Sequence, residues 1–278
     1  MNAVTPPLSP AAPPIALVSQ TAASQALRAA ATQVIALLRE VPRGDAPVPR
    51  SKWTVAETAI HLVAGTRVYL GCARGEPSPV ADLAALPELN ARLFREFPTR
   101  DPVALAALLD AAAADYLATT AAMAGDEPMP WHMGYPLPLA AMTGLLVGEL
   151  LLHGYDIARA VRRPWRIEPA HARCAIAGLA GALPLAVDPV ASRGLDVRYE
   201  LAVRGGPRFV CHFRDGALHV EPSGAAQVDC RLAVEPVPYL LIAYGRCSQW
   251  PAILRGQMRA GGRKPWLALR FKGLLRQV

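Results

Sequence analysis

The chain has 278 residues, of which 53% are hydrophobic and 18% charged, so it is long enough to form about two domains with buried cores. Its formal net charge of +7 favours acidic small molecules as partners. The basic residues are scattered and do not alternate with aromatic residues, which argues against binding of nucleic acid. The five cysteines form no CxxC pair, so we expect a reducing cytoplasm and neither disulfides nor a cysteine metal site.

The N-terminal segment is rich in proline and alanine and lacks basic residues. A signal peptide needs a basic start and an unbroken apolar run, and this segment has neither. We therefore expect residues 1–20 to be a disordered segment. The longest apolar stretch, residues 137–152, contains Pro138 and Glu149 and is too short for a comfortable membrane span. We therefore expect a water-soluble protein without a membrane partner.

Residues 21–165 are predicted to form a four-helix bundle. Thr54 and Glu57 have the spacing of a capping box, and Asp101 followed by Pro102 is typical of a helix start. Proline-rich segments and the stretch 126–137 have the chemistry of loops, and one short helix is expected before Phe97. Four long helices follow from apolar residues at helical spacing, over residues 21–41, 54–74, 102–123 and 138–161.

Residues 166–278 are predicted to form a second, smaller α+β domain. A helix over residues 169–183 is followed by segments that alternate polar and apolar residues. Gly205-Gly206 and Asp215-Gly216 are typical of hairpin turns, which predicts a small antiparallel sheet. Helical patterns return from Val237 to the end, so the fold class is α+β. The predicted strands are 195–204, 208–214, 217–221 and 227–234.

Glu149 and His153 lie four positions apart in the stretch GLLVGELLLHGYD, residues 144–156. Side chains at this spacing project from the same face of a helix, and this helix is apolar nearly all round, so we expect it to be buried. An ionised carboxylate is costly there unless a partner compensates its charge. A cation between the two side chains is one solution. A hydrogen bond between them, or an arginine from another helix, is the alternative.

His61 lies on the second predicted helix, among apolar residues and beside small ones such as Ala64 and Gly65. A lone histidine on an apolar helix is also compatible with an ordinary core residue that has one backbone partner. If this helix faces the fourth, two imidazoles and a carboxylate form a ligand set typical of a catalytic zinc site with one open position. Iron, nickel or manganese remain open on ligand type.

Three segments resemble a known family. WTVAETAIHL (53–62), GELLLHGYDIARA (148–160) and YGRCSQWPAILRGQMRAGGRKPWLALR (244–270) are similar to the DinB-like mycothiol-dependent maleylpyruvate isomerase family. The C-terminal part of those proteins is similar to a sterol-carrier-protein-2 (SCP2) fold. The resemblance extends over nearly the whole chain after about residue 20. It implies a DinB-like metal-binding bundle followed by an SCP2-like domain.

The resemblance also implies a site and a cofactor. The family's zinc ligands match His61, Glu149 and His153 in this chain. The metal is thought to hold the thiolate of mycothiol, a low-molecular-weight thiol, which in the isomerase adds to a cis double bond; rotation and elimination then give the trans product. Elementary chemistry supports such a role, because only the thiolate is a good nucleophile and a metal deprotonates a bound thiol.

Asp156 lies three residues after His153 and is a candidate to orient an imidazole from outside the ligand set. A structural salt bridge with Arg159, Arg162 or an arginine of the second domain is the alternative. His132, in the loop before the fourth helix, is a candidate general acid or base that lines the pocket mouth. An ordinary loop histidine is the alternative.

Three arginines near the C-terminus are candidates to bind a carboxylate of the substrate or of the thiol across the domain interface. The resemblance favours an arginine in this stretch, and we select Arg259 as the catalytic candidate, with Arg255 and Arg263 as cofactor-binding candidates. A solvated basic face without a ligand is the alternative.

The sequence therefore predicts a cytoplasmic, metal-dependent enzyme, with zinc favoured, that uses mycothiol for thiol addition, thiol transfer or cis–trans isomerisation of a small anionic substrate. A metalloenzyme that uses metal-bound water or substrate without a thiol is the first alternative. A non-enzymatic protein that binds a small molecule or lipid is the second. The chain is expected to be a monomer or a homodimer.

Overall fold

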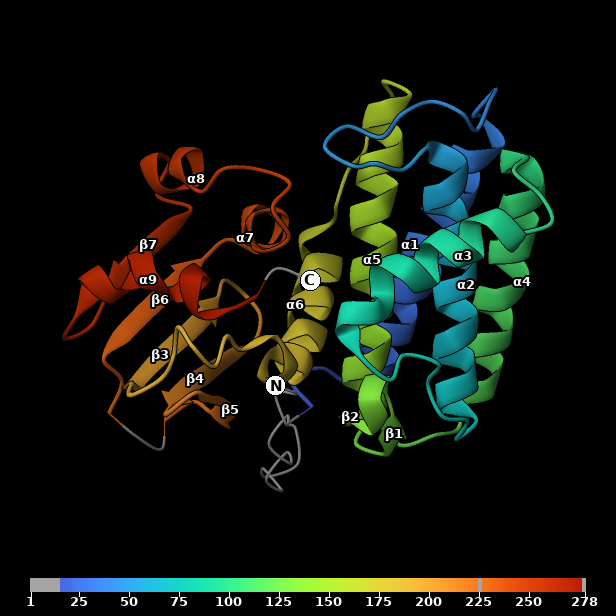
Figure 1. The fold of residues 1–278 in the computed structure, drawn as a ribbon. Coiled ribbons are helices and arrows are strands. Elements are labelled where there is room, and N and C mark those ends of the chain that lie inside the picture. The colour runs from blue at the N-terminus through green and yellow to red at the C-terminus, as the bar shows by residue number, and fades with distance from the viewer. Residues whose placement is uncertain (1–15, 225–226, 277–278) are drawn as a thin grey trace, which may run out of the picture.

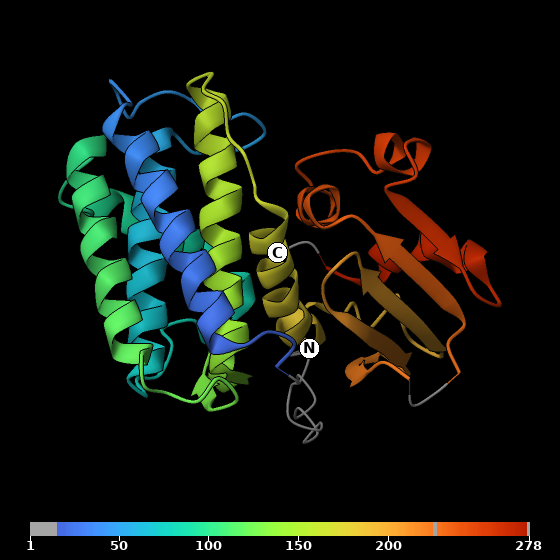
Figure 2. The same cartoon turned by 180° about the vertical axis from the view of Figure 1, so that it is seen from behind.

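The computed structural model describes residues 16–224 and 227–276. Four long helices lie side by side in the N-terminal half, and a smaller part that contains a sheet follows (Figures 1 and 2). The α+β fold class is thereby confirmed. Most of the predicted disordered segment, residues 1–15, lies outside the described residues. The bundle helices are α1 (Gln20–Arg39), α2 (Val55–Ala73), α4 (Pro102–Thr120) and α5 (Leu139–Ala160).

Local signals place the helix ends close to where the sequence predicts them. The Thr54 hydroxyl accepts from the Glu57 amide and the Glu57 carboxylate accepts from the Thr54 amide, so the predicted capping box is present at the start of α2. The Asp101 carboxylate caps α4, which has Pro102 in its first turn. Gly75, with a φ of 80°, follows the end of α2 in a conformation that favours glycine.

The connection between α4 and α5 differs from the predicted loop. It contains two short antiparallel strands, β1 (Pro128–Pro130) and β2 (Pro136–Pro138). Three residues per strand are too few to produce an alternating pattern, and the prolines that suggest a loop also hold the backbone extended. The short helix expected before Phe97 is α3 (Leu86–Glu96), which crosses one face of the bundle (Figure 1).

Helix α4 is long and apolar enough to cross a membrane by composition alone. It packs along α1 and α2, and Leu105, Leu109 and Tyr116 are buried between the helices. Its apolar character is therefore accounted for by the bundle core.

The C-terminal part contains a five-stranded sheet of order β5-β4-β3-β6-β7. The predicted hairpins β3–β4 and β4–β5 are present, but β3 and β6 pair in parallel, so the prediction of an antiparallel sheet was wrong at this pair. Parallel pairing joins segments that are distant in the chain, and no turn motif announces it. The strands are β3 (Asp196–Val203), β4 (Arg208–Arg214), β5 (Ala217–Pro222), β6 (Cys230–Val234) and β7 (Met258–Gly261).

The prediction of helices alone after Val237 was also wrong, because β7 lies in that stretch. It is a four-residue edge strand whose partner, β6, precedes it by more than twenty residues. Around it lie three short helices, α7 (Pro236–Ala243), α8 (Trp250–Leu254) and α9 (Ala268–Phe271).

Helix α6 (Pro169–Ala182) packs against both α5 and α7 and thereby connects the bundle with the sheet (Figure 2). Two glycines allow its close approach to α5. A Cβ atom at Gly178 would lie 2.3 Å from the Leu145 nitrogen, and one at Gly144 would lie 2.6 Å from the Cys174 carbonyl oxygen. Helix α5 is thus held firmly along one side, while its opposite side faces α2. We retain the domain boundary at residues 165–166 as a proposal.

Candidate metal centre

Three polar side chains from two bundle helices converge in the N-terminal half. His61 projects from α2, and Glu149 and His153 project from adjacent turns of α5. The Glu149 Oε2 atom lies 3.3 Å from His61 Nε2 and 3.4 Å from His153 Nε2. Each residue offers one ligand atom, and the three atoms lie within 4.8 Å of one another. The three residues named from the sequence are therefore adjacent in space.

The spacing of these atoms is compatible with a single tetrahedral ion. Zinc binds histidine nitrogen and carboxylate oxygen at about 2.0–2.2 Å, so two ligands of a tetrahedral site lie about 3.3–3.6 Å apart. The distances of 3.3 and 3.4 Å from Glu149 Oε2 to the two imidazoles fall in that range. Ordinary N–H···O hydrogen bonds are shorter, with a typical length of about 2.9–3.0 Å. The donor set and its spacing both fit a divalent ion.

The electrostatics of the site keep Glu149 ionised. Burial alone would raise its pKa, but hydrogen bonds from His153 and His61, together with their charges, hold the pKa of Glu149 well below its usual range. Burial would lower the pKa of His153, and the contacts with Asp156 and Glu149 outweigh this effect and raise it. An acid that stays anionic between two imidazoles is suited to share a cation with them.

The outward-facing nitrogens of both histidines contact oxygen atoms. His61 Nδ1 lies 3.3 Å from Asn90 Oδ1 on α3, and His153 Nδ1 lies 3.4 Å from Asp156 Oδ2. Neither oxygen carries a proton, so each favours the imidazole tautomer with hydrogen on Nδ1. With hydrogen retained on Nδ1, loss of the Nε2 hydrogen would leave Nε2 as the ligand atom, which is the arrangement of histidines that ligate a metal through Nε2.

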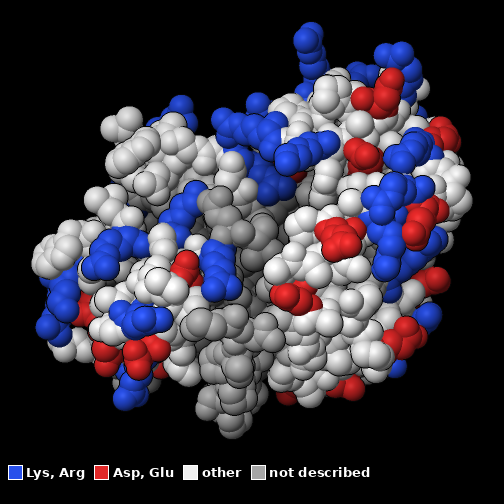
Figure 3. All heavy atoms as spheres, viewed as in Figure 1, with Lys and Arg blue, Asp and Glu red and all other residues white. Residues whose placement is uncertain are grey.

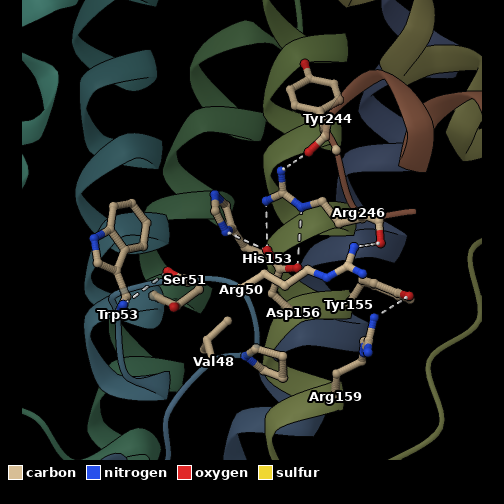
Figure 4. A pocket seen from close by; sticks show the side chains of 13 residues that line it. Val48, Arg50, Ser51, Trp53, His153, Tyr155, Asp156, Arg159, Tyr244 and Arg246 are labelled. Carbon is tan, nitrogen blue, oxygen red and sulfur yellow. Dashed lines mark hydrogen bonds and ion pairs between the residues drawn. The ribbon is translucent and has the colours of Figure 1, made fainter. Parts of the chain in front are cut away.

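Asp156 has a second partner from the C-terminal part of the chain. Arg246, in the segment after α7, donates to the Asp156 carboxylate through Nη2 at 2.7 Å and through Nε at 3.4 Å (Figure 4). Both side chains are largely buried. Burial alone would raise the pKa of Asp156, but hydrogen bonds with His153 and Arg246 hold it below its usual value. Asp156 therefore contacts an imidazole and also pairs with an arginine of the second domain, and its role in orienting a metal ligand stays a prediction.

Trp53 covers the two imidazoles on one side. Its ring centroid lies 5.0 Å from that of His61 and 5.9 Å from that of His153, and its edge also meets Phe94 on α3. It immediately precedes Thr54, the residue that caps the start of α2. Apolar cover of this kind limits access of water and strengthens electrostatic interactions beneath it.

A cavity of about 1430 Å³ opens beside these side chains and extends between the bundle and the C-terminal part. Helices α2, α3 and α5 form one wall. Trp250, Trp266 and Leu269 belong to the other wall and are more than half exposed. The lining is mainly apolar, and the cavity is large enough to hold two small molecules together beside Glu149.

Comparison with known proteins assigns the helical part to a family. Residues 27–158 match the model of the mycothiol maleylpyruvate isomerase N-terminal domain, and the match includes His61, Glu149 and His153. This helical domain belongs to that family. The resemblance predicted from the sequence is thereby confirmed. No curated protein matches the chain.

Solved structures extend the likeness of fold to the second domain. A crystal structure of the mycothiol-dependent maleylpyruvate isomerase is similar over 88% of this chain and 93% of that chain, with a TM-score of 0.55 and 14% identity. A structure of a histidine-to-alanine mutant of that isomerase gives a TM-score of 0.54 and 13% identity over the same shares. The similarity of fold to the isomerase therefore extends over both domains of this chain. The narrower likeness of the second domain to SCP2 stays a prediction.

His132 lines the same cavity but lies outside the group of three. Its Nδ1 atom is 2.8 Å from the Ser78 hydroxyl, and its ring stacks on Trp131 with centroids 4.2 Å apart. Burial lowers the pKa of His132 to about 4, although the charge of Glu149 acts in the opposite direction. The imidazole is therefore neutral at pH 7, and a pKa this far below 7 makes it a weak base.

The three arginines selected from the sequence lie apart from the ligand group. Arg259 lines the cavity from β7, and its Nε atom donates to the Gly256 carbonyl at 3.1 Å. Arg255 and Arg263 are exposed and are not among the residues that line the cavity. Within the described part of the chain, no ion pair joins any of them to Glu149.

Sequence reasoning did not single out Asn90 or Arg246. Arg246 belongs to the segment YGRCSQW that carries the family resemblance, so the motif offered a signal that reasoning from residue type alone overlooked. Asn90 lies in a short amphipathic helix with no motif of its own, and only the path of α3 across the bundle brings it to His61.

Proposed function

We propose that this protein is a metal-dependent enzyme that uses mycothiol for thiol addition, thiol transfer or cis–trans isomerisation of a small anionic substrate. The observation that carries the proposal is the convergence of His61, Glu149 and His153 within a domain of the mycothiol maleylpyruvate isomerase family. Two imidazoles and one carboxylate, with room beside them, favour zinc with an open ligand position.

A divalent ion held by these residues supplies one chemical function, the conversion of a bound thiol into its nucleophilic thiolate at neutral pH. The chain's own residues do the remaining work. Glu149 offsets one of the two positive charges, and Asn90 and Asp156 keep both imidazoles in the binding tautomer. Trp53 limits access of water, and the cavity keeps the thiol and the substrate side by side.

Two further residues belong to the proposal. His132 is the candidate to accept or return a proton during addition and elimination, because its imidazole lines the cavity. Arg259 is the candidate to orient an anionic group, since it lines the opposite wall. The five cysteines are all free, which fits the reducing cytoplasm that we retain as the proposed location.

Isothermal titration of metal-loaded, full-length protein with mycothiol tests the proposal. We expect one mycothiol per chain, with a heat that depends on the buffer because the thiol releases a proton. His61→Ala is expected to abolish this binding, and His171→Ala, on α6 and outside the cavity lining, is the matched control. Absence of mycothiol binding to metal-loaded wild type would favour the thiol-independent metalloenzyme instead.

The apolar lining of the cavity favours one non-enzymatic alternative, the binding of an apolar small molecule or lipid. That function needs no metal. Mass spectrometry of the purified protein distinguishes the two, because the alternative predicts a co-purifying lipid whose occupancy is unchanged in Glu149→Gln.

A further inference from the structure

A second, smaller pocket adjoins the candidate metal centre. It has a volume of about 240 Å³ and lies between the loop 48–51, the last turns of α5 and the segment 244–246. It shares Trp53, His153, Tyr244 and Arg246 with the large cavity. A group bound in the small pocket would therefore lie beside His153, which is also a candidate metal ligand.

Positive charge dominates this pocket. Arg50, Arg159 and Arg246 contribute to the lining, whereas Asp156 is its only acidic residue, so the formal charge of these four side chains is +2. Arg246 is neutralised by Asp156 at 2.7 Å. Among the residues that the structure describes, Arg50 and Arg159 form no ion pair. Figure 3 shows basic side chains gathered above the junction of the two domains, with few acidic ones among them.

The two arginines without ion pairs are exposed, and each donates one hydrogen bond within the protein. Arg50 Nη1 donates to the Arg246 carbonyl at 3.3 Å, and Arg159 Nη1 donates to the Tyr155 hydroxyl at 3.2 Å while its guanidinium lies over that ring (Figure 4). Each contact uses one of the five N–H donors of a guanidinium. Arg50 also has a φ of 65°, a left-handed backbone conformation that residues other than glycine seldom adopt.

We propose that this pocket binds a carboxylate group of the substrate, with Arg50 and Arg159 as its main donors. Guanidinium groups bind carboxylates through paired, charge-assisted hydrogen bonds, and an anion here would relieve the repulsion between neighbouring positive charges. The inference rests on the proposed function, because a carboxylate fixed beside His153 would set the orientation of the reactive carbons relative to the metal centre. Arg259, in the opposite wall of the large cavity, is then not needed for this contact.

Titration of the full-length protein with sodium maleate, at constant ionic strength, tests the assignment. Wild type is expected to bind maleate, and Arg50→Ala and Arg159→Ala are each expected to raise the Kd about tenfold or more, since charge-assisted hydrogen bonds to the carboxylate are lost. Arg159→Lys keeps the charge without the planar guanidinium group, and its Kd for maleate should lie between those of wild type and Arg159→Ala. Arg43→Ala is the matched control, because Arg43 lies on the same loop, is 82% exposed and is outside the pocket.

The metal content of the same samples separates this inference from the proposed function. Weaker maleate binding in both pocket variants, with the metal content of wild type, supports the inference. Equal maleate binding in Arg50→Ala, Arg159→Ala and Arg43→Ala would overturn it, even if all of them carry metal. If wild type holds no metal but binds maleate in an arginine-dependent manner, the carboxylate-binding pocket is supported and the proposed metal-dependent function is contradicted.

Discussion

Arg246 forms an ion pair of 2.7 Å with the Asp156 carboxylate, and the same carboxylate lies 3.4 Å from His153 Nδ1. A residue of the C-terminal domain is thus connected, through one carboxylate, to an imidazole of the bundle. The position of the second domain therefore influences the orientation of a candidate metal ligand. Removal of the carboxylate should weaken metal binding without removing a ligand.

Asp156→Asn tests this relationship. The substitution keeps the size of the side chain but removes the charge that holds the proton on His153 Nδ1 and that pairs with Arg246. We expect metal affinity to fall about 10- to 100-fold, the usual effect of losing such a partner. Competition with a chromophoric chelator measures it. Asp110→Asn, at an exposed carboxylate of α4 that pairs with Arg39, is the control, and equal affinities in both variants would show that Asp156 has no such role.

His132 makes the stability of the protein depend on pH. Its pKa is about 4 in the folded state, against an ordinary value of 6.5, so between these two values the unfolded chain binds more protons. Stability due to this residue is therefore complete above pH 6.5 and is lost as the pH falls toward 4, by at most about 1.4 kcal/mol per pH unit. Urea unfolding of wild type and His132→Gln at several pH values measures the difference.

The difference in unfolding free energy between wild type and His132→Gln should shrink as the pH falls from 6.5 to 4. Glu149 and Asp156 also have lowered pKa values, and their contribution is lost on acidification with the same sign. It is present in both proteins and largely cancels in the comparison. Parallel stability curves for the two proteins would be incompatible with a buried, neutral His132.

The close contact of α5 with α6 predicts opposite effects for two glycine substitutions. Gly178→Ala should destabilise the protein by about 1–3 kcal/mol, because its Cβ atom would lie 2.3 Å from the Leu145 nitrogen. Gly65→Ala on α2 has no atom within 4 Å of the new Cβ and should stabilise by about 0.5–1 kcal/mol, since alanine is the better helix former. Urea unfolding checks both variants, and equal effects would contradict the packing described.

Features encoded by neighbouring residues were predictable from the sequence. The cap formed by Thr54 and Glu57 and the shared helix face of Glu149 and His153 depend only on local spacing. The pairing of β3 with β6, the approach of Asn90 to His61 and the contact of Arg246 with Asp156 join segments that are distant in the chain. Such contacts depend on how the elements pack, and periodicity carries no information about them.

The central claim is that His61, Glu149 and His153 hold one divalent metal ion, and elemental analysis of purified protein tests it most directly. Wild type and His171→Ala should contain about one ion per chain, while His61→Ala, Glu149→Ala and His153→Ala should each retain less than about a tenth of that, because a site with three protein ligands loses most of its affinity with any one of them. Stoichiometric metal in all three ligand variants, or its absence from wild type prepared with zinc present, would contradict the account.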